Sequence, residues 1–155
     1  DALVRVVAGD FEVSDRMMLA VDVRAPGRTE TYRALNEAVL EKAKPGRIVR
    51  LDVAINGTPF TTFAADGVIV ATPTGSTAYS FSARGPIVSP RHDCIVLTPV
   101  SPHMLFDRSL VLGGEESIDF TVTADRPVAL NVDGRGIGEL RNGDRVRCTT
   151  AAAAG

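Results

Sequence analysis

The stretch Ile48-Val49-Arg50-Leu51-Asp52-Val53-Ala54-Ile55-Asn56-Gly57-Thr58-Pro59-Phe60-Thr61-Thr62-Phe63 decides the fold class. Its first half alternates apolar and polar residues, which predicts a strand with one buried face. Asn56-Gly57 then tolerates the positive φ angles of a two-residue type I′ turn, and residues 58–63 return as the partner strand. We therefore predict an antiparallel hairpin in this part of the chain.

The same period of two recurs on both sides of the hairpin. We expect further strands at residues 17–24, 68–71, 95–98, 117–122, 128–132 and 145–148. Turn pairs separate them, at Asp66-Gly67, Gly113-Gly114, Asp133-Gly134 and Asn142-Gly143. Strands and helices do not alternate regularly, which argues against a Rossmann fold. The sequence predicts a mainly β protein, a layered antiparallel sheet or β-sandwich-like arrangement with one or two short helices.

Two segments carry helical signals. Residues 1–8 have an amphipathic pattern that ends at Gly9, so we expect a short helix that packs as a lead-in to the sheets. Residues 76–83 begin with a hydroxyl residue available as N-cap and precede Gly85-Pro86, which forbids continuation. The second helix is therefore expected at residues 76–83.

Length, composition and charge limit the possible classes. The chain has 155 residues, 45% of them hydrophobic and 23% charged, which fits one globular domain at residues 1–150 followed by a linker-like tail at 151–155. A net charge of -2 gives no basic field for a nucleic acid. No apolar run approaches the roughly 18 residues that a membrane helix needs. We expect a cytoplasmic protein with no nucleic-acid or membrane partner.

The sulfur and imidazole side chains give no metal pattern. Cys94 and Cys148 are too few and too far apart for a disulfide framework or a zinc clip, so we expect two reduced thiols. His92 and His103 are eleven positions apart in irregular chain, which makes them poor joint ligands. We predict no metal site in this chain.

The most specific segment is residues 66–80, Asp-Gly-Val-Ile-Val-Ala-Thr-Pro-Thr-Gly-Ser-Thr-Ala-Tyr-Ser. It reads as a buried strand that leads into a hydroxyl-rich loop and then a helix start. Such a junction offers free backbone N–H groups, and Gly75 is expected to let a ligand approach the backbone closely. The residues alone leave two alternatives open, a loop for polar ligand atoms and an ordinary strand-to-helix turn.

Several motifs, in one order, resemble those of the NAD kinase family. They are Leu35-Asn36-Glu37, the segment Thr72-Pro73-Thr74-Gly75-Ser76-Thr77-Ala78-Tyr79 with Asp66-Gly67 before it and Ser82-Ala83-Arg84-Gly85-Pro86 after it, residues 99–110, and Asn131-Val132-Asp133-Gly134-Arg135. The likeness spans roughly residues 1–150 and corresponds to the C-terminal domain of that family, with residues 9–16 similar to the linker before it. An ordered set of motifs is far more specific than a lone glycine motif.

The resemblance implies an enzyme that transfers a phosphoryl group from ATP or polyphosphate to the adenosine ribose 2′-hydroxyl of NAD, with Mg²⁺ and as a homodimer or homotetramer. Asn36 and Glu37 would bind the adenosine end, where an ionised carboxylate accepts ribose hydroxyls well. Asp66 would meet the nicotinamide ribose. The other dinucleotide-binding residues that the resemblance implies are Thr74, Thr77, Ala78, Tyr79, Ser80, Phe81, Ser82, Ser101, Asp133 and Arg135.

The same residues have ordinary structural interpretations. Without the resemblance, Asn36-Glu37 would be a polar strand or loop pair, and Asp66 and Asp133 would be turn residues. Tyr79 would belong to the core, as aromatic residues early in a helix usually do. His103 stands where the family has its histidine, and the resemblance implies a structural role beside the pocket for it.

The catalytic part of the family pattern is missing. In the family, the carboxylate that accepts the hydroxyl proton lies in an upstream Gly-Gly-Asp-Gly motif, whereas Gly113-Gly114-Glu115-Glu116 here reads as an acidic turn. The loop at 74–77 lacks the lysine of a P-loop. We therefore predict no catalytic residue in this chain and expect an N-terminal kinase domain as its partner. The alternatives are a non-catalytic NAD- or NADP-binding module and a related lipid or sugar kinase-like domain.

Three positions depart from the family pattern. Arg84 stands where the family favours glycine, Ser109 replaces a proline, and Ala64 stands where many members have a basic residue. Two roles are open for Arg84, contact with a phosphate and capping of the helix C-terminus.

Overall fold

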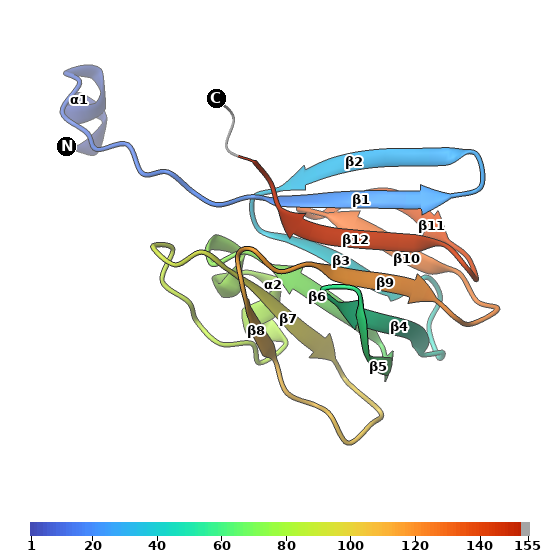
Figure 1. Ribbon diagram of the computed structural model, residues 1–155. Helices are drawn as coiled ribbons and strands as arrows, with labels where there is room; N and C mark the ends of the chain where they lie inside the picture. Colours follow the sequence, from blue (N-terminus) through green and yellow to red (C-terminus); the bar gives the residue numbers. More distant parts are fainter. Residues whose placement is uncertain (153–155) are drawn as a thin grey trace.

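The computed structural model describes residues 1–152, in which two six-stranded antiparallel sheets form the body of the molecule (Figure 1). In spatial order, the first sheet contains β2 (Arg28–Ala34), β1 (Leu19–Ala25), β12 (Arg145–Thr150), β9 (Ile118–Val122), β4 (Val49–Ile55) and β5 (Thr58–Ala65). The second contains β11 (Arg135–Leu140), β10 (Val128–Val132), β3 (Glu37–Lys42), β6 (Gly67–Ala71), β7 (Cys94–Val100) and β8 (Leu110–Gly113). The predicted mainly β, layered antiparallel class is confirmed.

The core lies between the sheets. Alternation along β1 buries Leu19, Val21 and Val23 in one apolar cluster with side chains of the second sheet such as Leu40 and Leu97. Each aliphatic side chain of this size contributes about 1.5–3 kcal/mol when it is fully removed from water. This shared cluster fixes the two sheets against each other and sets which face of each strand points outward.

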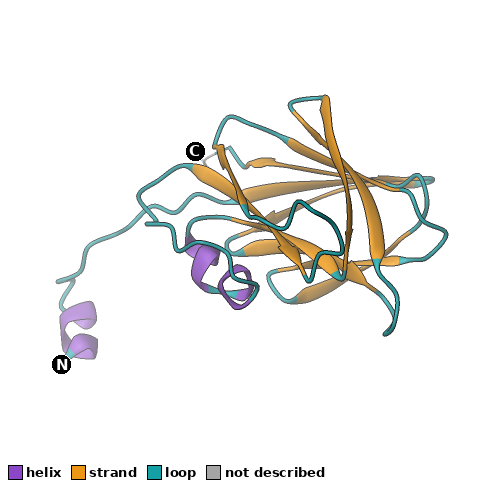
Figure 2. Cartoon of the chain, turned by 90° about the horizontal axis from the view of Figure 1, so that it is seen from below, coloured by secondary structure: helices purple, strands orange, loops and turns teal. Residues whose placement is uncertain are grey.

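The second sheet is covered on its outer face as well. Every residue of β6 is buried, and Val39, Ile69 and Val96 form a second apolar cluster on the face opposite the main core. Ala83 and Val88, from the irregular segment after β6, pack on this cluster. The chain between β6 and β7 is thereby held against the sheet (Figure 2).

All the strands predicted from the period of two are present, within two residues of the expected bounds. The central hairpin turns at Asn56 and Gly57 with φ angles of 52° and 78°, as expected for a type I′ turn. Pro59 is tolerated in β5 because that strand lies at the edge of its sheet. The change of direction predicted at Asp66-Gly67 is made by Asp66 alone, which bends the chain from β5 of one sheet into β6 of the other, while Gly67 already belongs to β6.

Four strands were not predicted, namely β2, β3, β8 and β11. The central strand β3 is buried on both faces over Glu37–Leu40, so its sequence does not alternate. β2 is a polar edge strand, and β11 contains two glycines, which weaken the strand signal.

The first helix forms, but its predicted packing is wrong. α1 (Ala2–Val7) is capped by the Asp1 carboxylate, which accepts from the Leu3 amide at 3.2 Å. None of its residues is buried, and the helix projects away from the sheets (Figure 1). The described chain offers no apolar surface to this helix, so Leu3 and Val7 remain 74% and 83% exposed.

The second predicted helix is divided into two short pieces. A 3₁₀ turn, η1 (Thr74–Thr77), and a single turn of α-helix, α2 (Tyr79–Ser82), are separated by Ala78 at φ -93° and ψ -126°. Neither piece has a side-chain N-cap, so the predicted hydroxyl cap is wrong. The break matters because it turns the segment back over the sheet.

None of the helices in residues 1–152 is long and apolar enough to cross a membrane. The predicted tail begins after β12, where the Ala151 amide donates to the Met18 carbonyl at 2.8 Å. Its last three positions, 153–155, lie outside the described residues.

Candidate functional site

The hydroxyl-rich bend at residues 72–79 lies directly against the Leu35–Glu37 segment. The Thr72 amide donates to the Asn36 carbonyl at 2.9 Å, and the Thr72 hydroxyl donates to the Leu35 carbonyl at 2.5 Å. The same hydroxyl oxygen accepts from the Gly75 amide at 3.0 Å. Two predicted motifs that lie far apart in the sequence are therefore joined by hydrogen bonds into one unit.

Gly75 lies against the backbone of Asn36. A Cβ atom at this position would lie 1.9 Å from the Asn36 carbonyl oxygen and 2.4 Å from the Asn36 carbonyl carbon. The space on the Cβ side of Gly75 thus accommodates the chain's own backbone, which accounts for the glycine without a ligand, and the approach of a ligand to this backbone stays a prediction. The glycine is needed for the contact between the two motifs.

Asp133 holds the Leu35–Glu37 segment from its other side. Its carboxylate accepts from the amides of Leu35, Asn36 and Glu37 at 2.7, 2.8 and 3.0 Å, and its own amide donates to the Glu37 carbonyl at 2.9 Å. Asp133 and Gly134 form the β10–β11 turn with φ angles of 49° and 77°, and the exposed Arg135 begins β11 just after it. The geometry makes Asp133 the anchor of the segment that carries Asn36 and Glu37.

Glu37 is the unusual group of this site. Glu37 is the first residue of β3, a central strand of the second sheet, and it is 8% exposed. Burial, and then the negative charge of Asp133, raise the pKa of its carboxyl, while a hydrogen bond from the Tyr79 backbone acts in the opposite direction. Within residues 1–152, Glu37 Oε2 is the buried side-chain oxygen or nitrogen atom that has no hydrogen-bond partner. Such an acceptor is costly unless a donor reaches it.

Asp66 and Tyr79 lie in a second group of charged and polar side chains. The Asp66 carboxylate is 3.2 Å from the Lys42 ammonium, and both side chains are about one-third exposed. Burial raises the pKa of the Tyr79 phenol, and the negative charges of Glu41 and Asp66 raise it further. Tyr79 therefore remains a neutral hydroxyl, able to donate a hydrogen bond near Asp66.

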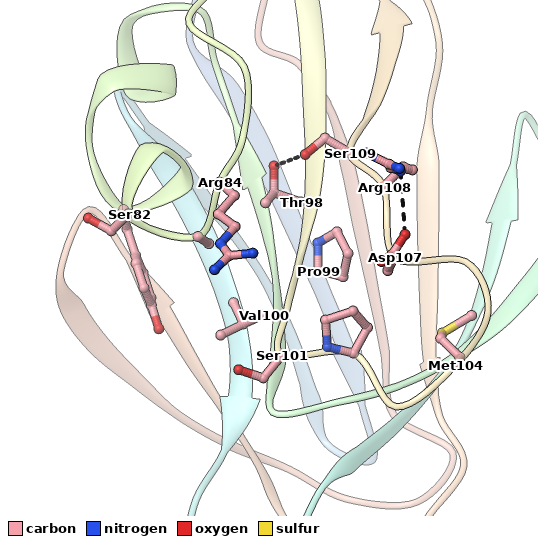
Figure 3. Close-up of a pocket in the computed structure, with 13 residues that line it drawn as sticks. Ser82, Arg84, Thr98, Pro99, Val100, Ser101, Met104, Asp107, Arg108 and Ser109 are labelled. Carbon is pink, nitrogen blue, oxygen red and sulfur yellow. Dashed lines mark hydrogen bonds and ion pairs between the residues drawn. The ribbon is translucent and has the colours of Figure 1, made fainter.

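A cavity of about 590 Å³ lies between α2 and the chain that leaves β7 (Figure 3). Three predicted site residues line it: Tyr79, Ser82 and Ser101. Its wall also includes Arg84 and the hydroxyls of Thr98 and Ser109, which are 3.0 Å apart. Asn36, Glu37 and Asp66 do not line this cavity, so the candidate site has an anchored polar edge and a separate hollow, with Tyr79 close to both.

The remaining predicted residues of the bend have different surroundings. Thr74 Oγ1 accepts from Arg16 at 3.5 Å, and Thr77 and Phe81 are exposed. Ala78 is partly buried at the break between η1 and α2. Ser80 is fully buried, with its hydroxyl 3.0 Å from the hydroxyl of Thr98. Its side chain therefore supports the floor beneath the cavity in this structure.

Comparisons with known proteins agree with this geometry. Residues 35–154 match the family described as the ATP-NAD kinase C-terminal domain. This chain belongs to that family.

Named relatives and solved structures extend the comparison. The NAD kinase of Citrifermentans bemidjiense is 46% identical over 151 residues, covering 96% of this chain and 52% of that protein. The NAD kinase of Moorella thermoacetica is 45% identical, covering 97% and 49%. Yeast NADH kinase complexed with NADH superposes with a TM-score of 0.90 at 32% identity, covering 97% of this chain and 45% of the yeast chain. An Archaeoglobus fulgidus NAD kinase in complex with ATP gives 0.75 at 26% identity, covering 97% and 56%.

The chain spans about half the length of the curated relatives that it matches. The family predicted from the sequence motifs is therefore confirmed. Sequence reasoning placed Arg84 and Ser109 among the departures from the family pattern without assigning them to the cavity. It missed Thr98, whose only signal was a polar residue inside an apolar strand.

Residues 1–152 gather no group of three or more His, Cys, Asp or Glu side chains that could hold a metal ion.

Proposed function

We propose that the protein containing this chain is an NAD kinase, which transfers a phosphoryl group from ATP or polyphosphate to the adenosine ribose 2′-hydroxyl of NAD to give NADP. This chain contributes the dinucleotide-binding surface. The observation that carries the proposal is the partnerless Oε2 atom of Glu37, buried beside Asn36 in the motif of an ATP-NAD kinase family domain. Ribose hydroxyls are hydrogen-bond donors of the kind that this atom lacks.

The site residues have complementary roles in this proposal. Glu37 accepts from the adenosine ribose, and Asn36 pairs with the same end of the dinucleotide through its amide. Asp66, held beside Lys42, accepts from the nicotinamide ribose, with the Tyr79 hydroxyl nearby. Thr74, Thr77, Ala78, Phe81, Ser82 and Ser101 contribute contacts along the bend and the cavity, and the exposed Arg135 contributes a contact beside the β10–β11 turn. Ser80 and Asp133 act through the scaffold around them.

The chemical step needs groups from outside this chain. A carboxylate must accept the proton of the attacking 2′-hydroxyl, and the donor phosphates with their Mg²⁺ must be held in line with it. We propose that an N-terminal kinase domain supplies the carboxylate in a Gly-Gly-Asp-Gly motif. The apolar side chains of α1, exposed at Leu3, Val6 and Val7, support an additional domain that covers them.

Assembly and location are parts of the same proposal. Among the described residues, each sheet has two edge strands that pair on one side only, β2 and β5 in one sheet and β11 and β8 in the other, and these edges support association into a homodimer or homotetramer. Analytical ultracentrifugation tests the assembly, and a monomer at micromolar concentration would contradict it. A cytoplasmic location stays a prediction for cell fractionation.

The decisive experiment measures NAD binding by calorimetry and NADP formation by a coupled assay in the purified protein. Glu37→Gln should weaken NAD binding at least tenfold, because loss of a hydrogen bond to a charged group costs about 1.5–3 kcal/mol. Glu139→Gln is the matched control, since Glu139 is an exposed carboxylate on β11, away from the bend. The absence of NAD binding, or equal affinity in both variants, would contradict the proposal. Binding without turnover, in a protein whose upstream sequence carries the Gly-Gly-Asp-Gly motif, would contradict the kinase assignment.

A further inference from the structure

Four non-glycine residues of the described chain have positive φ angles: Asn56, Asp133, Arg84 and Ser101. Asn56 and Asp133 lie in Asn-Gly and Asp-Gly hairpin turns, which require this conformation. Arg84, at φ 68°, and Ser101, at φ 45°, lie in no hairpin, and both line the 590 Å³ cavity. Residues with a strained backbone conformation are found most often at functional sites, where the strain is part of the function.

Arg84 ends α2 in the position that normally belongs to glycine. The amides of Ala83, Arg84 and Gly85 donate to the carbonyls of Tyr79, Phe81 and Ser80 at 3.0, 3.0 and 2.7 Å, so the chain closes the helix with a left-handed residue. Glycine is favoured there because a Cβ atom is strained in this conformation. Arg84 therefore destabilises the helix end relative to glycine. What the protein gains at this position is the guanidinium side chain.

The guanidinium does not cap the helix. Within the described chain, the hydrogen bonds at the end of α2 are made by backbone amides, and the side chain extends over the cavity toward Val100 (Figure 3). The cavity's other charged residues, Asp107 and Arg108, pair with each other at 3.5 Å. No ion pair within residues 1–152 includes Arg84. Arg84, which is exposed at the mouth of the cavity, is therefore its one positive charge without an ion-pair partner among the described residues, and the hydroxyls of Thr98, Ser101 and Ser109 lie in the cavity wall.

We propose that Arg84 binds a phosphate group of the ligand in this cavity and makes the site selective for phosphate-bearing nucleosides. A planar guanidinium donates two parallel hydrogen bonds to phosphate oxygens, and the hydroxyl of Ser101 lies on the same wall of the cavity, past Val100 (Figure 3). The identity of the ligand as a dinucleotide rests on the proposed function. The preference for a phosphate rests on the cavity itself.

The test compares ligands that differ by one phosphate. Binding of NAD, nicotinamide mononucleotide, nicotinamide riboside and inorganic pyrophosphate is measured for the wild type, Arg84→Gly and Arg84→Lys, together with thermal unfolding. Arg84→Gly should weaken the three phosphate-bearing ligands about tenfold or more, leave the riboside unchanged, and unfold at the same or a higher temperature. Arg84→Lys keeps the charge without the planar fork, so it should lose less than the glycine variant.

Each outcome decides one claim. Equal binding of the mononucleotide by the wild type and Arg84→Gly, or an equal loss for the riboside, would overturn the role of Arg84. A lower unfolding temperature in Arg84→Gly would also overturn it, because it would show that the arginine stabilises the helix end. If the wild type binds pyrophosphate through Arg84 but does not bind NAD, the proposed function fails and this inference stands.

Discussion

Replacing Asp133 with glycine should destabilise the fold although Asp133 is an exposed turn residue. Its carboxylate is the acceptor for the amides of Leu35, Asn36 and Glu37. Three hydrogen bonds to a charged acceptor would sum to about 4.5–9 kcal/mol at about 1.5–3 kcal/mol each. Two of the amides are at exposed positions, where water replaces the carboxylate, so we expect a net loss of about 2–4 kcal/mol. For a chain of this size that corresponds to about 4–16 °C in Tm.

Glycine is the appropriate substitution because it adopts the φ of 49° found at Asp133 without strain. Asp133→Ala should lose more, since alanine adds the strain of a left-handed conformation, and Asp133→Asn less, since it keeps one acceptor oxygen. Unfolding in urea, followed by circular dichroism, gives the free energies of unfolding. If Asp133→Gly keeps the stability of the wild type and loses only NAD affinity, the carboxylate contacts the ligand directly and the anchoring role is wrong.

Three further predictions follow from single residues. Gly75→Ala should lower the free energy of unfolding by about 3 kcal/mol or prevent folding, because its Cβ would meet the Asn36 backbone at 1.9 Å, while Gly136→Ala, with 3.6 Å to its nearest atom, should change Tm little in the same thermal melt. Glu37→Gln should have a higher free energy of unfolding than the wild type at neutral pH and lose that advantage in acid. Burial raises the folded-state pKa of Glu37, so its contribution to stability is present below the unfolded pKa and is lost as pH rises through the folded pKa. If the free energies of unfolding of the two proteins differ by the same amount from pH 4 to 8, this reasoning is wrong. Cys148 should resist alkylation until the protein unfolds, because burial raises the pKa of its thiol to about 12 from 9.0 and so lowers the thiolate fraction about a thousandfold, and equal labelling rates with and without urea, read by mass spectrometry, would refute it.

The sequence predicts those strands that bury one face and expose the other. β4, β9 and β10 alternate strictly because each has one side against the shared core and one toward solvent. β3 does not alternate because the bend covers its second face, so that both faces are buried over Glu37–Leu40. The burial that positions Glu37 thus also removes the period of two by which the strand could be predicted.

Pairing across the sheet was the other unpredictable element. The Asp133-Gly134 turn is evident from two residues, but its carboxylate reaches residues 35–37 only because β10 pairs with β3 in the register Val132 to Ala38. Likewise, Gly75 signals a close approach, and the residue that approaches is known only once β3 and β6 pair between Glu37 and Ala71. Local chemistry thus predicts that a position is special, and long-range register decides what it contacts.

The distribution of unfavourable features separates the site from its support. Three residues make contacts that stabilise the fold: Gly75 packs on the Asn36 backbone, Asp133 holds the amides of residues 35–37, and the Ser80 hydroxyl meets Thr98 of β7. Glu37, with a buried oxygen that lacks a donor, and Arg84, with a left-handed backbone, both cost stability. A fold loses such residues unless they are kept for another reason, and a ligand with ribose hydroxyls and phosphates satisfies both at once. The stability of Glu37→Gln and Arg84→Gly, measured beside their ligand affinities, therefore tests whether the binding surface is made of the residues that the fold alone would not select.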